Sequence, residues 1–407
     1  MRGATADQPG SPGDSGSART DEPTPSPAHL RRHPPRRVSV LLPVAGIVGL
    51  AVCGLLVLGL ATVRVGVLAV LIGVVAAVLP VLVVVAAFLW IDRWEPEPAR
   101  LLLFTFGWGA CVATLTALLV NDTAEAVGDL LLGTGSGGTV SAIVSAPLVE
   151  EAAKAVPVVA LMWRRSHEFD GVVDGIVYAG FSAAGFAFTE NIYYFGRAFV
   201  EHGLGDGLSS AGVLAAFLLR GVLSPFAHPL FSVVIGLGVG LVVRSRRRSA
   251  KIAIPLAAYV GAVLLHALWN ASATLGGADV FLDVYFLIMM PIFVSVVLVM
   301  LWQRRREQRI IAAALPGMAE AGWIAPSEVP LLSELRERAR WRRQARAESG
   351  RAAGRAVAAY QAAVTELAFA RRWAGDAAPE GRQAELLAVL RHTRREAVRL
   401  ATRRTDG

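Results

Sequence analysis

The sequence predicts an all-α fold, a polytopic membrane helical bundle of about eight transmembrane helices with a disordered N-terminal tail and a helical C-terminal tail. Two observations predict this class. Of the 407 residues, 54% are hydrophobic, above the roughly 45–50% of soluble proteins. The excess falls between positions 38 and 303, in runs of about twenty residues that are long enough to cross a bilayer. We therefore expect a tail at 1–37, a membrane domain at 38–303 and a second tail at 304–407.

The first 37 residues are rich in proline, serine, glycine and aspartate, and contain the stretches PTPSP and HPPRR. Such a composition cannot bury a core, so we predict disorder. No cleavable signal peptide is expected, because a polar stretch precedes the first apolar run and no small-residue cleavage site follows it. Cys53 and Cys111 both lie in apolar runs. They are expected to be small core residues and not a disulfide or a metal site.

Eight apolar segments follow, and the second contains Pro80. The sixth is too long for one straight span and holds Pro225 and Pro229. We predict a bent or broken helix there, of the kind that lines a protein-enclosed cavity. Alternatively, 209–223 is a separate short span or a re-entrant segment. The predicted spans are 39–62, 65–90, 101–121, 140–163, 172–197, 209–243, 252–272 and 281–302.

The basic residues between these spans gather on one side of the predicted membrane. Sixteen flank the spans on that side, whereas only Arg64 and Arg197 lie on the other. Because positive loops stay inside, both termini are expected in the cytoplasm. The loop 122–139 has no basic residue and is expected outside.

The C-terminal tail is rich in alanine, arginine, glutamate and leucine. Helical periodicity appears at 327–347, 350–373 and 380–404, and we expect Pro316, Pro326, Pro330 and Pro379 to interrupt it. The expected structure is a solvated helical appendage near anionic lipid headgroups. No motif specific for nucleic acid is present.

The fourth span carries Glu150, Glu151 and Lys154 near its middle. Ionisable groups at that depth indicate function by default, because burying each one is unfavourable without a partner. On a helix Lys154 lies four residues from Glu150, which predicts an ion pair, while Glu151 points about 100° away toward a cavity. The alternative is a buried pair that only locks helix packing.

Three further spans carry polar groups at membrane depth. Span direction places Glu151, Glu190, His228 and His266 between the midplane and the extracytoplasmic face, on four neighbouring helices. A carboxylate can act as general base, a histidine can orient or polarise, and Asn270 could donate to a developing oxyanion. The same two acids and two histidines could instead hold Zn²⁺, which activates a bound water. The polar residues of these three spans are Asp174, Glu190, Arg220, His228, His266 and Asn270.

Taken together, these motifs resemble those of PrsW-type intramembrane proteases, which are related to the CAAX-processing and bacteriocin-processing membrane proteases. The resemblance covers about 90–275 and includes DRWEPEP at 92–98. Glu190 stands where the CAAX branch has histidine, which favours PrsW. The motifs are EExxK (Glu150, Glu151, Lys154), FxxxEN (Phe186, Glu190, Asn191), Arg220 followed by HxxF (His228, Phe231), and HxxxN (His266, Asn270).

The resemblance implies a bacterial cell-membrane endopeptidase that cuts a membrane-tethered protein, such as an anti-sigma factor, near the extracytoplasmic side. One of the paired glutamates would activate water. The family is often labelled metallopeptidase, which implies Zn²⁺, but Lys154 one turn from Glu150 favours a metal-free glutamate mechanism. The expected partners are the substrate and the lipid bilayer, and nothing indicates an oligomeric state. The expected catalytic residues are Glu150, Glu151, Lys154, Glu190, His228, His266 and Asn270.

Other protease classes lack their signatures. There is no HExxH, Gly203-Leu204-Gly205-Asp206 is a GxGD match in a polar loop, and Gly135-Ser136-Gly137 lies in the outer loop. The strongest rival is a proton-coupled transporter, in which intramembrane glutamate and histidine relay protons. Against it, the two halves of the membrane region show no internal repeat. A third interpretation is a non-catalytic scaffold that presents the C-terminal tail.

Overall fold

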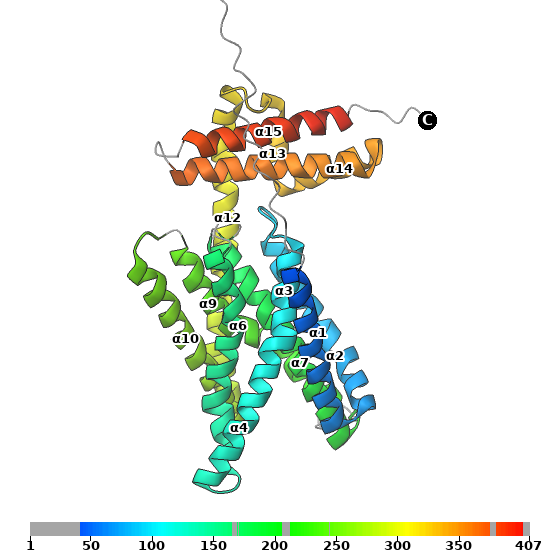
Figure 1. Cartoon of the computed structure of the whole chain (residues 1–407), viewed down its shortest axis with the longest axis vertical. Coiled ribbons are helices and arrows are strands. Elements are labelled where there is room, and N and C mark those ends of the chain that lie inside the picture. Colours follow the sequence, from blue (N-terminus) through cyan, green and yellow to red (C-terminus); the bar gives the residue numbers. More distant parts are fainter. Residues whose placement is uncertain are drawn as a thin grey trace, which may run out of the picture. The chain divides into compact units, whose positions relative to one another are not determined.

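The computed structural model describes residues 41–164, 169, 171–205, 212–243, 245–374 and 380–401, so the predicted disorder at 1–37 lies outside them. The described chain is helical and contains no strand, and seven helices are long and apolar enough to cross a membrane. The all-α membrane class is therefore confirmed (Figure 1).

The α-helices follow one another in the order α1 (Leu41–Val65), α2 (Val67–Ile91), α3 (Ala99–Gly107), α4 (Thr114–Leu132), α5 (Ser136–Val140), α6 (Ala146–Arg164), α7 (Val172–His202), α8 (Val213–Phe217), α9 (Ala227–Val242), α10 (Arg248–Leu275), α11 (Gly277–Val284), α12 (Met290–Glu320), α13 (Val329–Ser333), α14 (Leu335–Ala374) and α15 (Glu380–Ala401). Four π-helical segments join some of them, namely η2 (Trp108–Ala113), η3 (Ser141–Ser145), η4 (Leu218–Leu223) and η5 (Tyr285–Met289). A short 3₁₀ turn, η6 (Pro326–Glu328), precedes α13.

The fourth predicted span forms a helix but is not among the seven apolar ones. It runs through α5, η3 and α6 without a break. The three charged residues near its middle, Glu150, Glu151 and Lys154, are all buried inside the protein. This helix contacts α4, α7, α9 and α10, so other helices take the place of lipid around the charges.

The central element of the membrane region is α7. Its apolar window is 83% buried, against 6% for that of α1. Glycines let its neighbours approach closely, as small residues do in membrane helix pairs. A Cβ on Gly175 would lie 2.1 Å from the carbonyl oxygen of Gly236 in α9, and one on Gly185 would lie 2.0 Å from that of Phe106 in α3. Only glycine fits at these crossings.

The sixth predicted span is broken, as its prolines indicate. The helix formed by α8 and η4 ends at Leu223, and α9 begins at Ala227. In the break, the amide and hydroxyl of Ser224 both donate to the carbonyl of Leu219, at 2.9 and 2.7 Å. Pro229 sits in the first turn of α9, where a missing amide hydrogen is tolerated. The break positions the start of α9 against the centre of the bundle.

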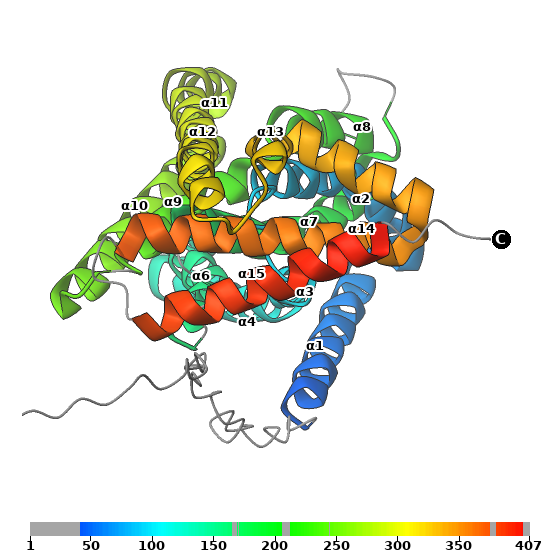
Figure 2. The same cartoon turned by 90° about the horizontal axis from the view of Figure 1, so that it is seen from above.

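The C-terminal tail is a packed unit and not the solvated appendage that its composition predicted. Figures 1 and 2 show α14 and α15 side by side, and they share a core that includes Tyr360 and Leu390. Trp94, from the loop between α2 and α3, enters this core and is 2% exposed. The expected interruption at Pro316 is wrong, because α12 continues through it to Glu320. The helix α14 is kinked at Gly350, where φ is 83°, between the predicted helical windows 327–347 and 350–373.

Candidate active site

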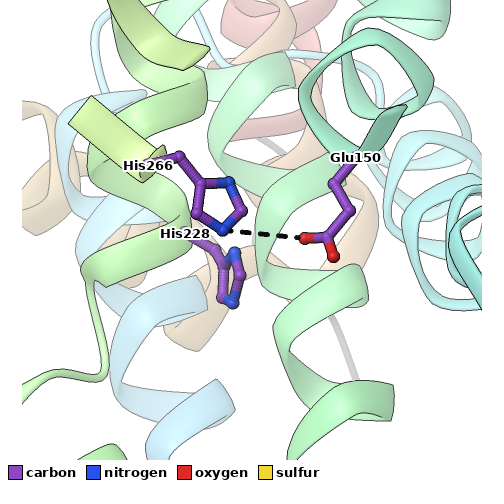
Figure 3. Close-up of side chains that lie close together, drawn as sticks. All are labelled: Glu150, His228 and His266. Carbon is purple, nitrogen blue, oxygen red and sulfur yellow. Dashed lines mark ion pairs between the residues drawn. The ribbon is translucent and has the colours of Figure 1, made fainter. Parts of the chain in front are cut away.

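Four helices bring the predicted polar residues together. α6 supplies Glu150, Glu151 and Lys154, α7 supplies Glu190, the first turn of α9 supplies His228, and α10 supplies His266. Figure 3 shows Glu150 and His266 facing one another, with His228 beside them.

Lys154 is completely buried and contacts both acids of its own helix. Its Nζ lies 2.6 Å from Oε1 of Glu151 and 3.8 Å from Oε2 of Glu150. The sequence predicted the closer pair with Glu150, so the two acids exchange roles. Nζ also lies 4.4 Å from the centre of the Phe186 ring, a cation–π contact that replaces lost hydration.

Glu151 is 0% exposed, yet both oxygens of its carboxylate accept hydrogen bonds. Besides Lys154, it accepts a hydrogen bond from the Ser232 hydroxyl at 2.7 Å and one from Nδ1 of His266 at 3.0 Å. Partners of this kind are required of a buried charge. The bond to Nδ1 also fixes the His266 ring with its Nε2 toward Glu150.

Glu150 is the exception in this network. Its Oε2 is buried and has no hydrogen-bond partner, and the nearest recorded ring nitrogen is Nε2 of His266 at 3.9 Å, marked by the dashed line in Figure 3. Its Oε1 accepts a long bond, 3.4 Å, from Asn121 of α4, which Ser145 holds at 2.9 Å. A buried oxygen that accepts no hydrogen bond is unfavourable by about 1–3 kcal/mol, so this atom is available to accept a hydrogen bond from water or to bind a ligand.

His228 lies between a cation and an anion. Its Nδ1 is 3.2 Å from Nζ of Lys154, and its Nε2 is 2.7 Å from Oε2 of Glu190. Because an ammonium group only donates, Nδ1 must accept, which leaves Nε2–H to donate to Glu190. Arg220 of η4 forms an ion pair with Glu190 and donates to Asn191 at 2.9 Å.

Two phenylalanines of the predicted motifs hold the imidazole rings. Phe231 stacks on His266 with ring centres 4.9 Å apart and an interplanar angle of 19°. Phe186 packs against His228 at 5.3 Å. Phe231 also lines an apolar cavity of about 300 Å³ that extends past Phe226 to Trp269. The site therefore borders an apolar space beside the broken helix.

Asn270 lies one turn beyond His266 but does not point at the acids. Its amide donates to the carbonyl of Ala142 at 2.8 Å, within the π-helical segment that precedes α6. Asp174, another predicted intramembrane acid, caps the start of α7 by accepting from the amide of Gly171 at 2.8 Å. The structure thus separates Asp174 from the site.

Two site residues were not predicted from the sequence, Asn121 and Ser232. Each contacts one of the paired glutamates. Their only sequence signal is a small polar residue within or beside an apolar run, and such residues also serve ordinary helix packing.

Among the described residues, one group in the site could hold a metal ion. Glu150, His228 and His266 each offer a ligand atom, and these atoms lie within 4.8 Å of one another. A carboxylate and two imidazoles suit Zn²⁺, and Oε2 of Glu150, which accepts no hydrogen bond, fits a ligand role. Glu151 and Glu190, predicted as ligands, instead bind the ring nitrogens of the two histidines, as carboxylates behind metal-binding histidines do. The Lys154 ammonium would compete with an ion for Nδ1 of His228.

Residues 97–296 match the family model described as PrsW family intramembrane metalloprotease. The matched segment includes every acid and histidine of the site. It ends at residue 296, before the packed C-terminal unit. No curated protein and no solved structure matches the chain.

Proposed function

We propose that this chain, whose residues 97–296 match the family of PrsW intramembrane metalloproteases, hydrolyses a peptide bond of a membrane-tethered protein with water activated at Glu150, His228 and His266. The family match favours this peptidase over the transporter and the scaffold. The observation that carries the proposed chemistry is the buried Oε2 of Glu150, which accepts no hydrogen bond and faces an imidazole whose other nitrogen is bound by Glu151.

We assign the catalytic role to the residues around that oxygen. Glu150 would take a proton from the attacking water, and His266 and His228 would orient the water and the substrate carbonyl. Glu151, Glu190 and Lys154 act through other groups, so we class them as positioning residues. Asn270 would position the π-helical segment through Ala142.

Whether the site uses a metal ion depends on three side chains. The donor set of Glu150, His228 and His266 fits Zn²⁺, and a bound ion would supply Lewis acidity that activates water and polarises the scissile carbonyl. Glu151 would then keep Nε2 of His266 available by binding its Nδ1–H. In the metal-free alternative, the Lys154 ammonium is the local cation and Glu150 alone is the base.

The proposed substrate is a membrane-tethered regulator, such as an anti-sigma factor, cut near the extracytoplasmic side. A substrate of this kind must bring an apolar segment to the site, and the cavity beside Phe231 is apolar and lies next to the broken helix. The distribution of arginine supports an orientation with both termini in the cytoplasm.

The first test replaces the proposed base. Glu150→Gln keeps the shape of the side chain but cannot take a proton, so we expect peptide-bond hydrolysis to fall at least a hundredfold. The measurement is a comparison of new protein N-termini in membranes of cells that carry either the native chain or the variant. New termini within or beside transmembrane segments should depend on Glu150.

Glu201→Gln is the matched control, because Glu201 pairs with Arg197 at the exposed end of α7. It should leave the set of new termini unchanged. If Glu150→Gln inserts normally and yields the same termini as the native chain, the assignment of Glu150 is wrong.

Metal content distinguishes the two mechanisms. If Zn²⁺ binds, the purified native chain should contain about one ion, and His266→Ala should lose it. Glu151→Gln should weaken metal affinity by about 10–100-fold, because it removes the acceptor behind His266. Elemental analysis after dialysis against graded chelator concentrations checks this. Activity that persists in protein without bound metal would support the glutamate mechanism.

A further inference from the structure

A basic cavity lies between α12 and α14, outside the segment that matches the family. It has a volume of about 650 Å³ and is lined by Arg306, Arg309, Arg371 and Arg372 together with small and apolar residues. The described lining residues include no acid. We call it the arginine cavity. Its size falls within the roughly 300–1,000 Å³ of ligand pockets.

The helical repeat explains how this cavity forms. On α12, Arg306, Ala313 and Gly317 recur at helical spacing and share one face. Arg371 and Arg372 approach that face from α14. A Cβ on Gly317 would lie 3.8 Å from Nη1 of Arg371. Small residues on α12 therefore leave the space into which the arginines of α14 reach.

Three arginines of the cavity, Arg309, Arg371 and Arg372, have no acidic partner among the described residues. Arg309 donates only to the backbone carbonyl of Arg305, at 3.3 Å, and Arg371 lies over the Trp323 ring at 5.0 Å. Neither of these residues nor Arg372 forms an ion pair with a described acidic residue. Arginines gathered in this way repel one another unless an anion joins them, and the guanidinium fork matches phosphate.

The position of the cavity along α12 indicates the source of the anion. Trp302, 53% exposed, ends the apolar part of the helix, where aromatic residues mark the membrane interface. Arg306 and Arg309 follow after four and seven residues, about 6 and 10 Å further along the axis. The headgroup layer extends roughly 5–8 Å beyond the hydrocarbon core. The arginines therefore lie at or just beyond the level of lipid phosphates.

We propose that the arginine cavity binds the phosphate of an anionic phospholipid headgroup, with Arg309, Arg371 and Arg372 as its ligands. A zwitterionic headgroup would bring its own cation among the arginines, so the cavity should select lipids with a net negative charge. The bound lipid would join α12 to α14 at the membrane surface. This proposal does not depend on the protease chemistry.

Native mass spectrometry of the full chain in mixed micelles tests the proposal, with phosphatidylglycerol as probe and phosphatidylcholine as reference. Phosphatidylglycerol should bind saturably, and Arg309→Gln with Arg371→Gln should weaken it about thirtyfold, since each arginine near the surface contributes about 1 kcal/mol. Arg309→Lys with Arg371→Lys should keep most of the affinity. Arg305→Gln with Arg351→Gln is the control of equal charge, because both residues are exposed outside the cavity.

Three results would overturn the proposal. The first is equal binding of the two lipids. The second is an equal loss of binding in the control pair. The third is displacement of phosphatidylglycerol by millimolar inorganic phosphate or ATP, which would make a soluble phosphate compound the ligand. A native circular dichroism spectrum of the glutamine pair excludes unfolding as the cause of lost binding.

Discussion

Lys154 is the residue on which the buried charges of the site depend. It is 0% exposed and lies within 3.8 Å of both glutamates, so it compensates two carboxylates that lipid and protein would otherwise leave unpaired. A charge left without its partner in such a place destabilises a protein strongly. The stability of the site therefore depends on this ammonium group.

We predict that Lys154→Met lowers the free energy of unfolding by about 3–5 kcal/mol, because it leaves Glu151 buried and unpaired. Adding Glu151→Gln removes that charge and should restore part of the loss. Unfolding by SDS in mixed micelles measures both. The exposed pair of Arg197 and Glu201 is the control, and Arg197→Gln should change stability by less than about 1 kcal/mol. Equal losses in the single and double variants would contradict the pairing.

At the residue scale, the sequence predicts most of the side chains that lie together in the candidate site but not how they pair. The spacing of Glu150 and Glu151 lets either one reach Lys154, because positions three and four apart are both neighbours on a helix. Ser232 and His266, from other helices, decide in favour of Glu151. Contacts between helices are not encoded in the spacing within one of them, so the exchange of roles could not be foreseen.

At the element scale, the crossing of α7 and α9 sets the geometry of the site. Gly175 and Gly236 each occupy a position where a Cβ would lie 2.1–2.2 Å from the carbonyl oxygen of the other. This close approach holds Ser232 and His228 of α9 against the acids of α6 and α7. A longer side chain at the crossing must push the two helices apart.

We therefore predict that Gly236→Ala lowers protease activity at least tenfold and destabilises the fold by about 1–3 kcal/mol, the usual effect of overpacking. Gly261→Ala is the matched control, because its Cβ would meet only Val234, at 3.8 Å. That variant should be as stable as the native chain or slightly more so, since alanine favours the helix. Thermal unfolding and substrate cleavage are measured for both variants. If Gly236→Ala and Gly261→Ala changed stability and activity by the same amount, the close crossing of α7 and α9 would not be what sets the geometry of the site.

Element boundaries followed well from the sequence where periodicity or proline marked them. The break at Pro225 is an example. The interruption predicted at Pro316 is wrong because a proline can lie within a helix, with a kink, when packing holds the turn. Here Leu315 and Met318 on either side of it are packed in the C-terminal core. The π-helical segments had no sequence signal, since they depend on how neighbouring helices dock.

At the scale of the whole molecule, the loop at 92–98 joins the membrane bundle to the C-terminal unit. Trp94 enters the C-terminal core, and Arg338 lies over its ring at 5.1 Å. Three residues further on, Glu97 accepts a hydrogen bond from Tyr178 of α7. The domain boundary proposed at 303–304 falls within α12, which is a second link. The sequence could not predict the packing of Trp94, because its partners lie more than two hundred residues away.

This loop makes stability depend on pH. Burial raises the pKa of Asp92 from 3.8 to about 8 and that of Glu97 from 4.5 to about 10, and nearby Asp174 adds to both. The folded chain thus keeps protons that the unfolded chain has already lost, so stability falls as pH rises from about 4 toward the folded-state values. The slope is at most about 1.4 kcal/mol per pH unit for each group.

Asp92→Asn should flatten this dependence between pH 5 and 8, while keeping an oxygen that accepts the hydrogen bond from the amide of Glu97. Thermal unfolding midpoints of the native chain and the variant at several pH values measure the effect. Asp129→Asn, near the end of α4, is a control with the same chemical change at a half-buried carboxylate that also accepts hydrogen bonds from backbone amides. If the variant and the native chain gave identical slopes, Asp92 would not be the titrating group.

The three buried charges of α6, on Glu150, Glu151 and Lys154, also affect how the protein is inserted during synthesis. As an isolated segment, this helix would enter the bilayer poorly, since each charge near its centre opposes insertion by about 2.5–3.5 kcal/mol. Its partners Ser232 and His266 are synthesised later in the chain. We therefore expect α6 to remain at the translocon, or bound to helices made earlier, until α9 and α10 have been synthesised and inserted. Its residence in the bilayer is a property of the assembled bundle and not of the segment itself.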